Sequence, residues 1–156
     1  MLPLGSFVNI QKANPIFKPW SGAKIDDSYG NKMVLNFYGH PDFAELGILR
    51  MMERSGWNGV WIDTYRNKFR TQYWPKNEVQ LPLEQETLFR QIQEVAGCTA
   101  GCFDVFCWKG NEFMFIEAKR SRKDKIRMTQ RAWLQAAINQ CRVPLPSLLI
   151  VEWDLP

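Results

Sequence analysis

The sequence predicts a single mixed α/β domain in which helices flank a small mixed β-sheet. Three observations lead to this prediction. The chain has 156 residues, of which 46% are apolar, and this is enough for one hydrophobic core. Helical and strand patterns alternate in the order helix, strands, helix, hairpin, helix, strand. No uninterrupted apolar run is longer than the four residues of 148–151, which is far too short for a membrane helix, so we expect no membrane association.

The first 30 residues show no sustained periodicity, and prolines and glycines interrupt them repeatedly. We therefore expect an irregular N-terminal arm over 1–30, with one short strand at most, and one domain over 31–156. Residues 33–38 predict a strand or an extended lead into the first helix. The first residues have neither the basic start nor the apolar segment of a signal peptide. We therefore expect a cytoplasmic protein, a class that includes nucleoid-associated proteins and those encoded by phages or mobile elements.

The first helix is predicted over 42–55. Asp42 can act as its N-cap, and Glu45 three residues later completes a capping-box pattern. Apolar residues follow at helical spacing: Leu46, Leu49 and Met52. A buried strand is expected at 59–63, and the polar and aromatic segment 65–80 predicts a strand followed by a loop.

Two further helices and a final strand complete the predicted order. The second helix is expected from 82 to 95, because Pro82 suits a helix start and Gly97 a helix stop. A third helix is predicted over 127–140, and prolines separate it from a buried strand at 148–153.

A β-hairpin between the second and third helices carries the most informative acidic residues. Its strands are predicted at 103–108 and 112–118, with a tight Gly-Asn turn at 109–111. An antiparallel pairing about this turn places Asp104 opposite Glu117. Two like charges in directly opposite positions destabilise a sheet.

A divalent cation between the two carboxylates would remove this conflict, because Mg²⁺ is held by one or two carboxylates plus phosphate oxygens. Lys119 shares a strand face with Glu117, where it could orient a water molecule or stabilise developing negative charge. The alternative is an ordinary surface ion pair between Lys119 and one of the acids, which contributes little to stability.

Two other polar residues border apolar helix faces. Gln130 lies within the apolar stripe of the third helix, and a buried amide needs hydrogen-bond partners. It could bind a backbone group at the sheet edge, or it could point at the carboxylates. Glu45 borders the apolar face of the first helix, where it could cap the helix and also point toward a site.

Three segments of the chain resemble the PD-(D/E)XK nuclease superfamily, and in particular its virus-type replication–repair nuclease (VRR-NUC) domain. They are residues 101–104 (GCFD), 115–119 (FIEAK) and 124–134 (DKIRMTQRAWL). The resemblance covers about 40–153 and includes the spacing from Asp124 to Gln130. Phe103 stands where this family has a proline that shapes the entry to the strand.

The resemblance implies a restriction-endonuclease-like core in the order αβββαβ and a metal-dependent endonuclease that hydrolyses DNA phosphodiester bonds. It further implies structure-selective action on branched DNA of the Holliday-junction or flap type. Symmetric cutting of two strands would favour a homodimer. These expectations are analogies with the family.

The resemblance also implies roles for individual residues. The catalytic set would be Glu45, Asp104, Glu117, Lys119 and Gln130. The ligands of Mg²⁺ or Mn²⁺ would be Asp104, Glu117, the backbone carbonyl of Ala118, and Glu45. In this scheme Lys119 positions the attacking water, and Gln130 supports the site.

The net charge of +4 is concentrated in one segment, because residues 119–131 contain seven basic residues and one acidic residue. Basic residues beside a site can bind phosphates and make binding salt-dependent. The predicted DNA contacts are Arg120, Arg122, Lys123, Lys125, Arg127 and Arg131. The alternative is a solvated loop and helix face. Four aromatic residues could stack on unpaired bases, although such residues more often belong to a core: Trp61, Tyr65, Tyr73 and Trp74.

Composition limits the other kinds of chemistry. The single histidine, His40, excludes sites built from several histidine ligands within one chain. The four cysteines have no CxxC pair, so we interpret them as reduced, buried thiols rather than a metal cluster. Two alternatives to an active nuclease stay open: an inactive nuclease-fold module that binds nucleic acid or protein, and a small regulatory or structural protein whose charges form surface pairs.

Overall fold

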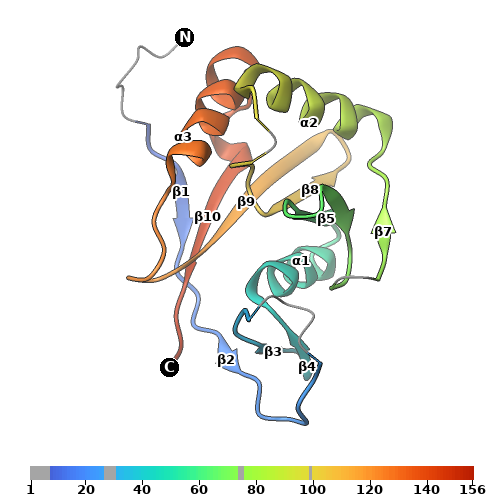
Figure 1. Ribbon diagram of the computed structural model, residues 1–156, viewed down its shortest axis with the longest axis vertical. Helices are drawn as coiled ribbons and strands as arrows, with labels where there is room; N and C mark the ends of the chain where they lie inside the picture. Colours follow the sequence, from blue (N-terminus) through green and yellow to red (C-terminus); the bar gives the residue numbers. More distant parts are fainter. Residues whose placement is uncertain (1–7, 27–30, 74–75, 99) are drawn as a thin grey trace.

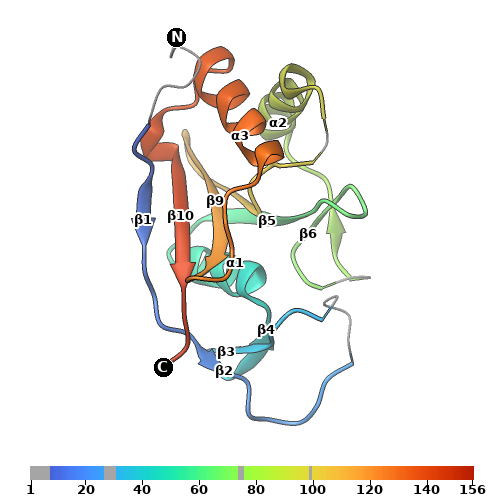
Figure 2. The same cartoon turned by 60° about the vertical axis from the view of Figure 1, so that its left-hand side comes forward.

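A mixed sheet of seven strands passes through the molecule and carries helices on both faces (Figures 1 and 2). The computed structural model describes residues 8–26, 31–73, 76–98 and 100–156. In spatial order the strands are β1 (Gln11–Ala13), β10 (Leu148–Trp153), β9 (Glu112–Arg120), β8 (Val105–Lys109), β5 (Asn58–Asp63), β6 (Lys68–Arg70) and β7 (Glu78–Val79). The β1–β10 and β10–β9 pairs are parallel and the others are antiparallel, so the predicted mixed α/β class is confirmed.

The N-terminal segment contributes two short strands rather than one. β1 extends the main sheet by pairing with β10. β2 (Lys18–Pro19) forms a small antiparallel sheet with β3 (Leu35–Phe37) and β4 (His40–Asp42). Between β1 and β2, Phe17 is buried, with its ring 5.8 Å from Trp153 and 4.9 Å from Phe37. The described part of this segment therefore packs into the core.

Helix α1 (Ala44–Arg54) covers one face of the sheet, and its predicted capping box was wrong. The N-cap residue is Phe43, which makes no side-chain capping bond. Asp42 belongs to β4, where it pairs with Leu35. Because strand pairing extends the backbone through Asp42, the helix begins two residues later than predicted, and Glu45 is free to bind elsewhere.

Helices α2 (Leu83–Ala96) and α3 (Met128–Gln135) pack on the opposite face, mainly through aromatic side chains. The second helix matches its predicted range, and α3 continues as a π-helical turn over Ala136–Gln140 that the sequence did not indicate. A 3₁₀ turn at Leu145–Ser147 then leads into β10. No helix in the described ranges has the length and apolar composition needed to cross a bilayer.

The predicted β8–β9 hairpin is present with the predicted register. Val105 pairs with Ile116, so the next positions outward are Asp104 and Glu117. The ladder ends there because the Ala118 N–H donates to the Asp104 side chain at 2.9 Å instead of to a backbone carbonyl. β8 consequently starts two residues later than predicted, and Asp104 lies just before the strand.

The segment between β5 and α2 contains two short strands, β6 and β7, where one strand and a loop were predicted. β6 is held to β5 by a buried ion pair in which Arg70 Nε lies 3.0 Å from Asp63 Oδ2. With β1–β4, β6, β7, α2 and the two short helical turns before β10 set aside, the other elements follow the order α1, β5, β8, β9, α3, β10.

Candidate active site

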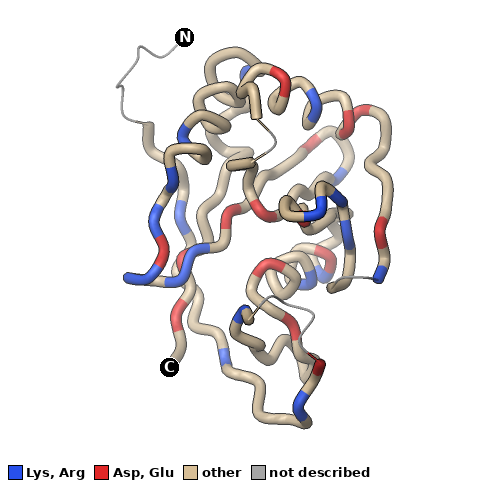
Figure 3. The backbone as a smooth tube through the Cα atoms, in the orientation of Figure 1, with Lys and Arg blue, Asp and Glu red and all other residues tan. Residues whose placement is uncertain are grey.

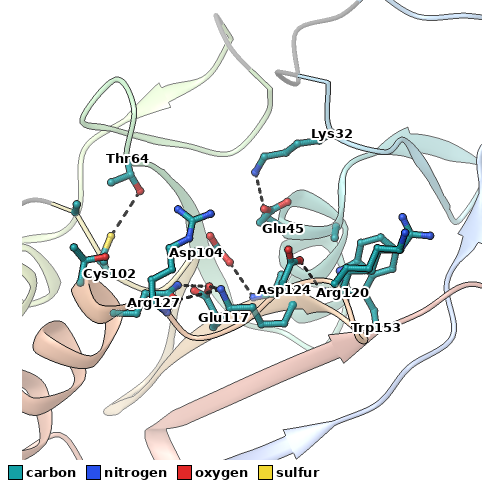
Figure 4. Close-up of a pocket in the computed structure, with 18 of the residues that line it drawn as sticks. Lys32, Glu45, Thr64, Cys102, Asp104, Glu117, Arg120, Asp124, Arg127 and Trp153 are labelled. Atoms are coloured by element: carbon teal, nitrogen blue, oxygen red, sulfur yellow. Dashed lines mark hydrogen bonds and ion pairs between the residues drawn. The ribbon is translucent and has the colours of Figure 1, made fainter.

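The five residues predicted to be catalytic all line one cavity of about 580 Å³ (Figure 4). They come from four places in the fold: the first turn of α1, the residue before β8, the end of β9, and the first turn of α3. These residues are Glu45, Asp104, Glu117, Lys119 and Gln130. Residues far apart in the sequence are thus brought to one end of the β8–β9 hairpin.

Asp104 and the backbone of Ala118 lie side by side where the hairpin ladder ends. Asp104 Oδ2 accepts the Ala118 N–H at 2.9 Å. In a strand, the N–H and C=O of one residue point toward the same neighbour. The Ala118 carbonyl is therefore directed toward the same edge as Asp104. This places a backbone oxygen beside the carboxylate, as the predicted ligand set requires.

Glu117 is buried, and its two oxygens differ in their surroundings. Oε1 accepts hydrogen bonds from Lys119 Nζ, 2.9 Å away, and from Gln130 Nε2. Oε2 is buried and has no hydrogen-bond partner among the described residues. A buried carboxylate oxygen without a partner is rare and calls for an explanation such as an ion or a water molecule. Glu117 thus has one oxygen fixed by the protein and one available to a ligand.

Gln130 connects the acid and the base of the site. Its Oε1 accepts hydrogen bonds from Lys119 Nζ at 3.1 Å and from the Arg127 N–H at 3.0 Å, while its Nε2 donates to Glu117. Lys119 and Gln130 are both buried. The alternative of an exposed surface ion pair is therefore wrong, since the Lys119 and Glu117 side chains are only 11% and 3% exposed.

The carboxylates of the site repel one another in a poorly solvated place. Burial, together with the charges of Glu117 and Glu45, raises the pKa of Asp104 well above its ordinary value. Burial also raises the pKa of Glu117, against the opposite effects of Lys119 and Gln130. Both shifts mean that the ionised pair is disfavoured without a compensating positive charge.

The donor set fits Mg²⁺ or Mn²⁺. Its oxygens belong to Asp104, Glu117 and the Ala118 carbonyl, and Mg²⁺ takes few protein ligands and retains several waters. The described residues contain no cluster of three or more His, Cys, Asp or Glu side chains placed to hold a metal. The ligand role that the family resemblance implies for Glu45 stays a prediction.

Glu45 is bound by a residue that the sequence did not single out. Lys32 Nζ lies 2.6 Å from Glu45 Oε1, and both side chains line the cavity. Lys32 precedes β3 in a segment without periodicity or motif, so no sequence signal marked it. Thr64 and Cys102 also line the cavity and were not predicted as site residues.

The predicted DNA contacts divide into two groups by whether they line the cavity, and Figure 3 shows the concentration of basic residues in the segment that follows β9 in blue. Arg120, Lys123 and Arg127 line it. The other three are exposed outside it: Arg122, Lys125 and Arg131. Arg120 lies over the Trp153 ring, with its guanidinium carbon 5.4 Å from the ring centre, so part of this side chain has a packing role.

The aromatic residues and the cysteines also separate into different environments. Trp61 is buried in the core, Tyr73 is partly buried, and Tyr65 is 92% exposed, whereas Trp74 lies outside the described residues. All four cysteines are free thiols. Burial raises the pKa of Cys102 to about 12, so this thiol stays protonated at the wall of the cavity.

Comparison of the chain with protein-family models, with curated proteins and with solved structures finds no match. The chemistry of the site therefore has to be argued from its residues. Glu117 is buried and Asp104 partly buried, the Ala118 backbone lies beside Asp104, and Lys119, Arg120, Lys123 and Arg127 line the same cavity.

Proposed function

We propose that this protein is a metal-dependent endonuclease that hydrolyses DNA phosphodiester bonds, with a restriction-endonuclease-like core of the PD-(D/E)XK type similar to VRR-NUC domains. The observation that supports this most is the group at the end of one hairpin in which the partly buried Asp104 lies with three buried residues, Glu117, Lys119 and Gln130. The element order α1, β5, β8, β9, α3, β10 agrees with the helix and strand order of that core.

Asp104, Glu117 and the Ala118 carbonyl would hold Mg²⁺ or Mn²⁺. Such an ion supplies positive charge beside the scissile phosphate and makes a bound water more acidic. Lys119 is held by Glu117 and Gln130 at 2.9 and 3.1 Å, so its ammonium has a fixed position at the cavity wall. There it orients the attacking water and neutralises charge on the phosphate oxygens. Gln130 holds the Glu117 and Lys119 side chains in fixed positions through its hydrogen bonds to both.

The surrounding cations would hold the DNA backbone. Arg120, Lys123 and Arg127 line the cavity, and further basic residues continue along the loop and α3. A phosphate backbone laid across this surface gives salt-dependent binding. We further propose branched DNA as the preferred substrate, with a homodimer supplying two sites wherever both strands are cut symmetrically.

A cleavage assay tests this proposal. Purified protein is incubated with branched and linear DNA of matched sequence, with Mg²⁺, with Mn²⁺ and with EDTA. Wild type should cut only with a metal, and Asp104→Asn and Lys119→Ala should lose at least about 100-fold in rate. Glu112→Gln is the matched control, because Glu112 is an exposed carboxylate in β9, at the opposite end of this strand from Lys119. This variant should cut like wild type.

Other outcomes would favour the alternatives. Unchanged cleavage by Asp104→Asn and Lys119→Ala would reject this site. A wild-type protein that binds DNA in a salt-dependent manner but cuts no substrate with either metal would be a binding module. The absence of any salt-dependent DNA binding would favour a regulatory or structural protein.

A further inference from the structure

Lys32 brings a second lysine into the cavity from a different part of the fold than Lys119. It lies in the segment that leads into β3, and this segment is held by a hydrogen bond from the Trp20 N–H to the Val34 carbonyl at 3.1 Å. Lys32 lines the cavity (Figure 4), and Met33 beside it in the sequence does so as well. The segment before β3 therefore contributes to the wall of the candidate active site.

The Lys32 ammonium is fixed in place by an acid and two aromatic rings. Its Nζ lies 2.6 Å from Glu45 Oε1, and 4.9 and 5.9 Å from the ring centres of Phe43 and Trp61. Both rings belong to the core, so they offer a rigid surface for the cation. A lysine held in this way loses less conformational entropy on binding a ligand than a free surface lysine.

The ammonium keeps its charge and has hydrogen-bonding capacity to spare. Burial opposes the charge, but Glu45, and to a lesser extent Asp104 and Asp63, raise the pKa of Lys32. A lysine ammonium has three N–H donors. Among the described residues, Glu45 accepts one of them. The side chain is 42% exposed, so the remaining donors are accessible from the cavity.

The position of Lys32 complements the other cations. Arg120, Lys123 and Arg127 line the cavity from the end of β9 and the approach to α3, whereas Lys32 lines it from the segment before β3. An anionic strand in the cavity would have basic residues from two separate elements around it, with Asp104 and Glu117 in the same cavity.

We infer that Lys32, anchored by Glu45, binds a backbone phosphate of the nucleic acid and so positions the strand at Asp104 and Glu117. This inference rests on the proposed function and deepens it. It also gives Glu45 a different role from the metal ligand expected from the family resemblance: Glu45 is a positioning residue that acts through Lys32.

The test measures binding of a fluorescein-labelled DNA duplex by anisotropy over a range of salt concentrations, with Ca²⁺ in place of Mg²⁺ and a gel to verify that the DNA stays intact. Lys32→Met should weaken binding and reduce the slope of log K against log salt by about 0.9, the value for one phosphate contact. Lys32→Arg should restore the slope. Glu45→Gln keeps the cation, so the slope should stay while the Mg²⁺-dependent cleavage rate falls.

Lys12→Met is the matched control, because Lys12 pairs with Glu152 at the same 2.6 Å distance but does not line the cavity. It should leave the slope unchanged. If Lys32→Met also leaves the slope unchanged, the inference is overturned. A fall in its melting temperature equal to that of Glu45→Gln would then show that the pair is merely structural. Failure of the wild-type protein to bind DNA would overturn the proposed function as well as the inference. DNA binding by wild type with an unchanged slope for Lys32→Met would overturn the inference alone.

Discussion

A single amide, that of Gln130, organises the charges of the candidate site. Its oxygen accepts from Lys119 and from the Arg127 backbone, and its nitrogen donates to Glu117. The donors and acceptors around it allow one orientation of the amide. Gln130 is therefore a positioning residue. Its amide can be buried because Lys119, Glu117 and the Arg127 backbone satisfy its hydrogen bonds.

Replacing Gln130 by alanine should loosen both charged partners. Glu117 and Lys119 would each lose a hydrogen bond in a buried place, so Gln130→Ala should reduce the free energy of unfolding by about 1–3 kcal/mol. It should also reduce Mg²⁺-dependent cleavage. Gln135→Ala, an exposed position on the same helix, is the control and should change neither quantity. Urea denaturation and initial cleavage rates measure the two effects, and equal behaviour of the two variants would contradict this role.

The raised pKa values of Asp104 and Glu117 predict how stability depends on pH in EDTA. The pKa values of Asp104 and Glu117 are raised in the folded protein, so folding favours their protonated forms. The two carboxyl groups do not lower the free energy of unfolding below their pKa in the unfolded chain, which is about 4. They lower it increasingly as the pH rises from there through their pKa values in the folded protein. Metal-free wild type should therefore lose melting temperature relative to Asp104→Asn between acidic and neutral pH. A constant difference between the two proteins over this pH range would contradict the raised pKa of Asp104.

Among the structural elements, the loop before β8 and the first turn of α3 approach closely at Gly101. This glycine has a φ of 88°, and a Cβ atom there would lie 2.2 Å from the Thr129 carbonyl oxygen. The loop carries Asp104, and the helix turn carries Gln130. The close approach therefore joins the two elements that supply the acid and its positioning residue.

Gly101→Ala should separate these elements. Ala at a positive φ costs more than about 1 kcal/mol of unfolding free energy by itself, and here the backbone of α3 would also have to move. Gly39→Ala is the matched control, because Gly39 has a similar φ of 82° and open space where the Cβ would lie. Gly101→Ala should lose more stability in chemical denaturation and more cleavage activity than Gly39→Ala, and similar losses in the two variants would show that the close approach at Gly101 does not matter.

The hairpin could be predicted from sequence because its information is local. The turn at Gly110 fixes the register, and the register places Asp104 opposite Glu117. The start of α1 could not be predicted in the same way. Asp42 has a good local capping signal, but its pairing with Leu35 in the small sheet prevails over that signal.

At the scale of the whole molecule, the features that sequence reasoning missed depend on distant pairings. β1 pairs with β10 at the other end of the chain, and Lys32 reaches Glu45 only because the small sheet places its segment beside α1. Neither β1 nor the segment around Lys32 has a periodic pattern or a motif that would predict these contacts. The site residues within the hairpin and α3 were predicted, whereas the contribution of the N-terminal segment needed the structure.

If this segment is part of the domain, its core residue should be essential for stability. Phe17 is 7% exposed and packs against Phe37 and Trp153, so Phe17→Ala should cost about 3–5 kcal/mol of unfolding free energy. Ile16→Ala serves as control, since the neighbouring Ile16 is 62% exposed. Chemical denaturation measures both variants. Equal, small effects would show that the segment is a dispensable arm.

The central claim is that Asp104 and Glu117 form a metal site with which this chain cuts DNA. Its most direct test is the rate of DNA cleavage as Mn²⁺ is titrated into wild type, Asp104→Asn and Glu117→Gln. Wild type should show saturable, Mn²⁺-dependent cleavage, and each variant should cut at least about 100-fold more slowly at every Mn²⁺ concentration. Equal rates in the three proteins, or no cleavage by wild type, would contradict the claim.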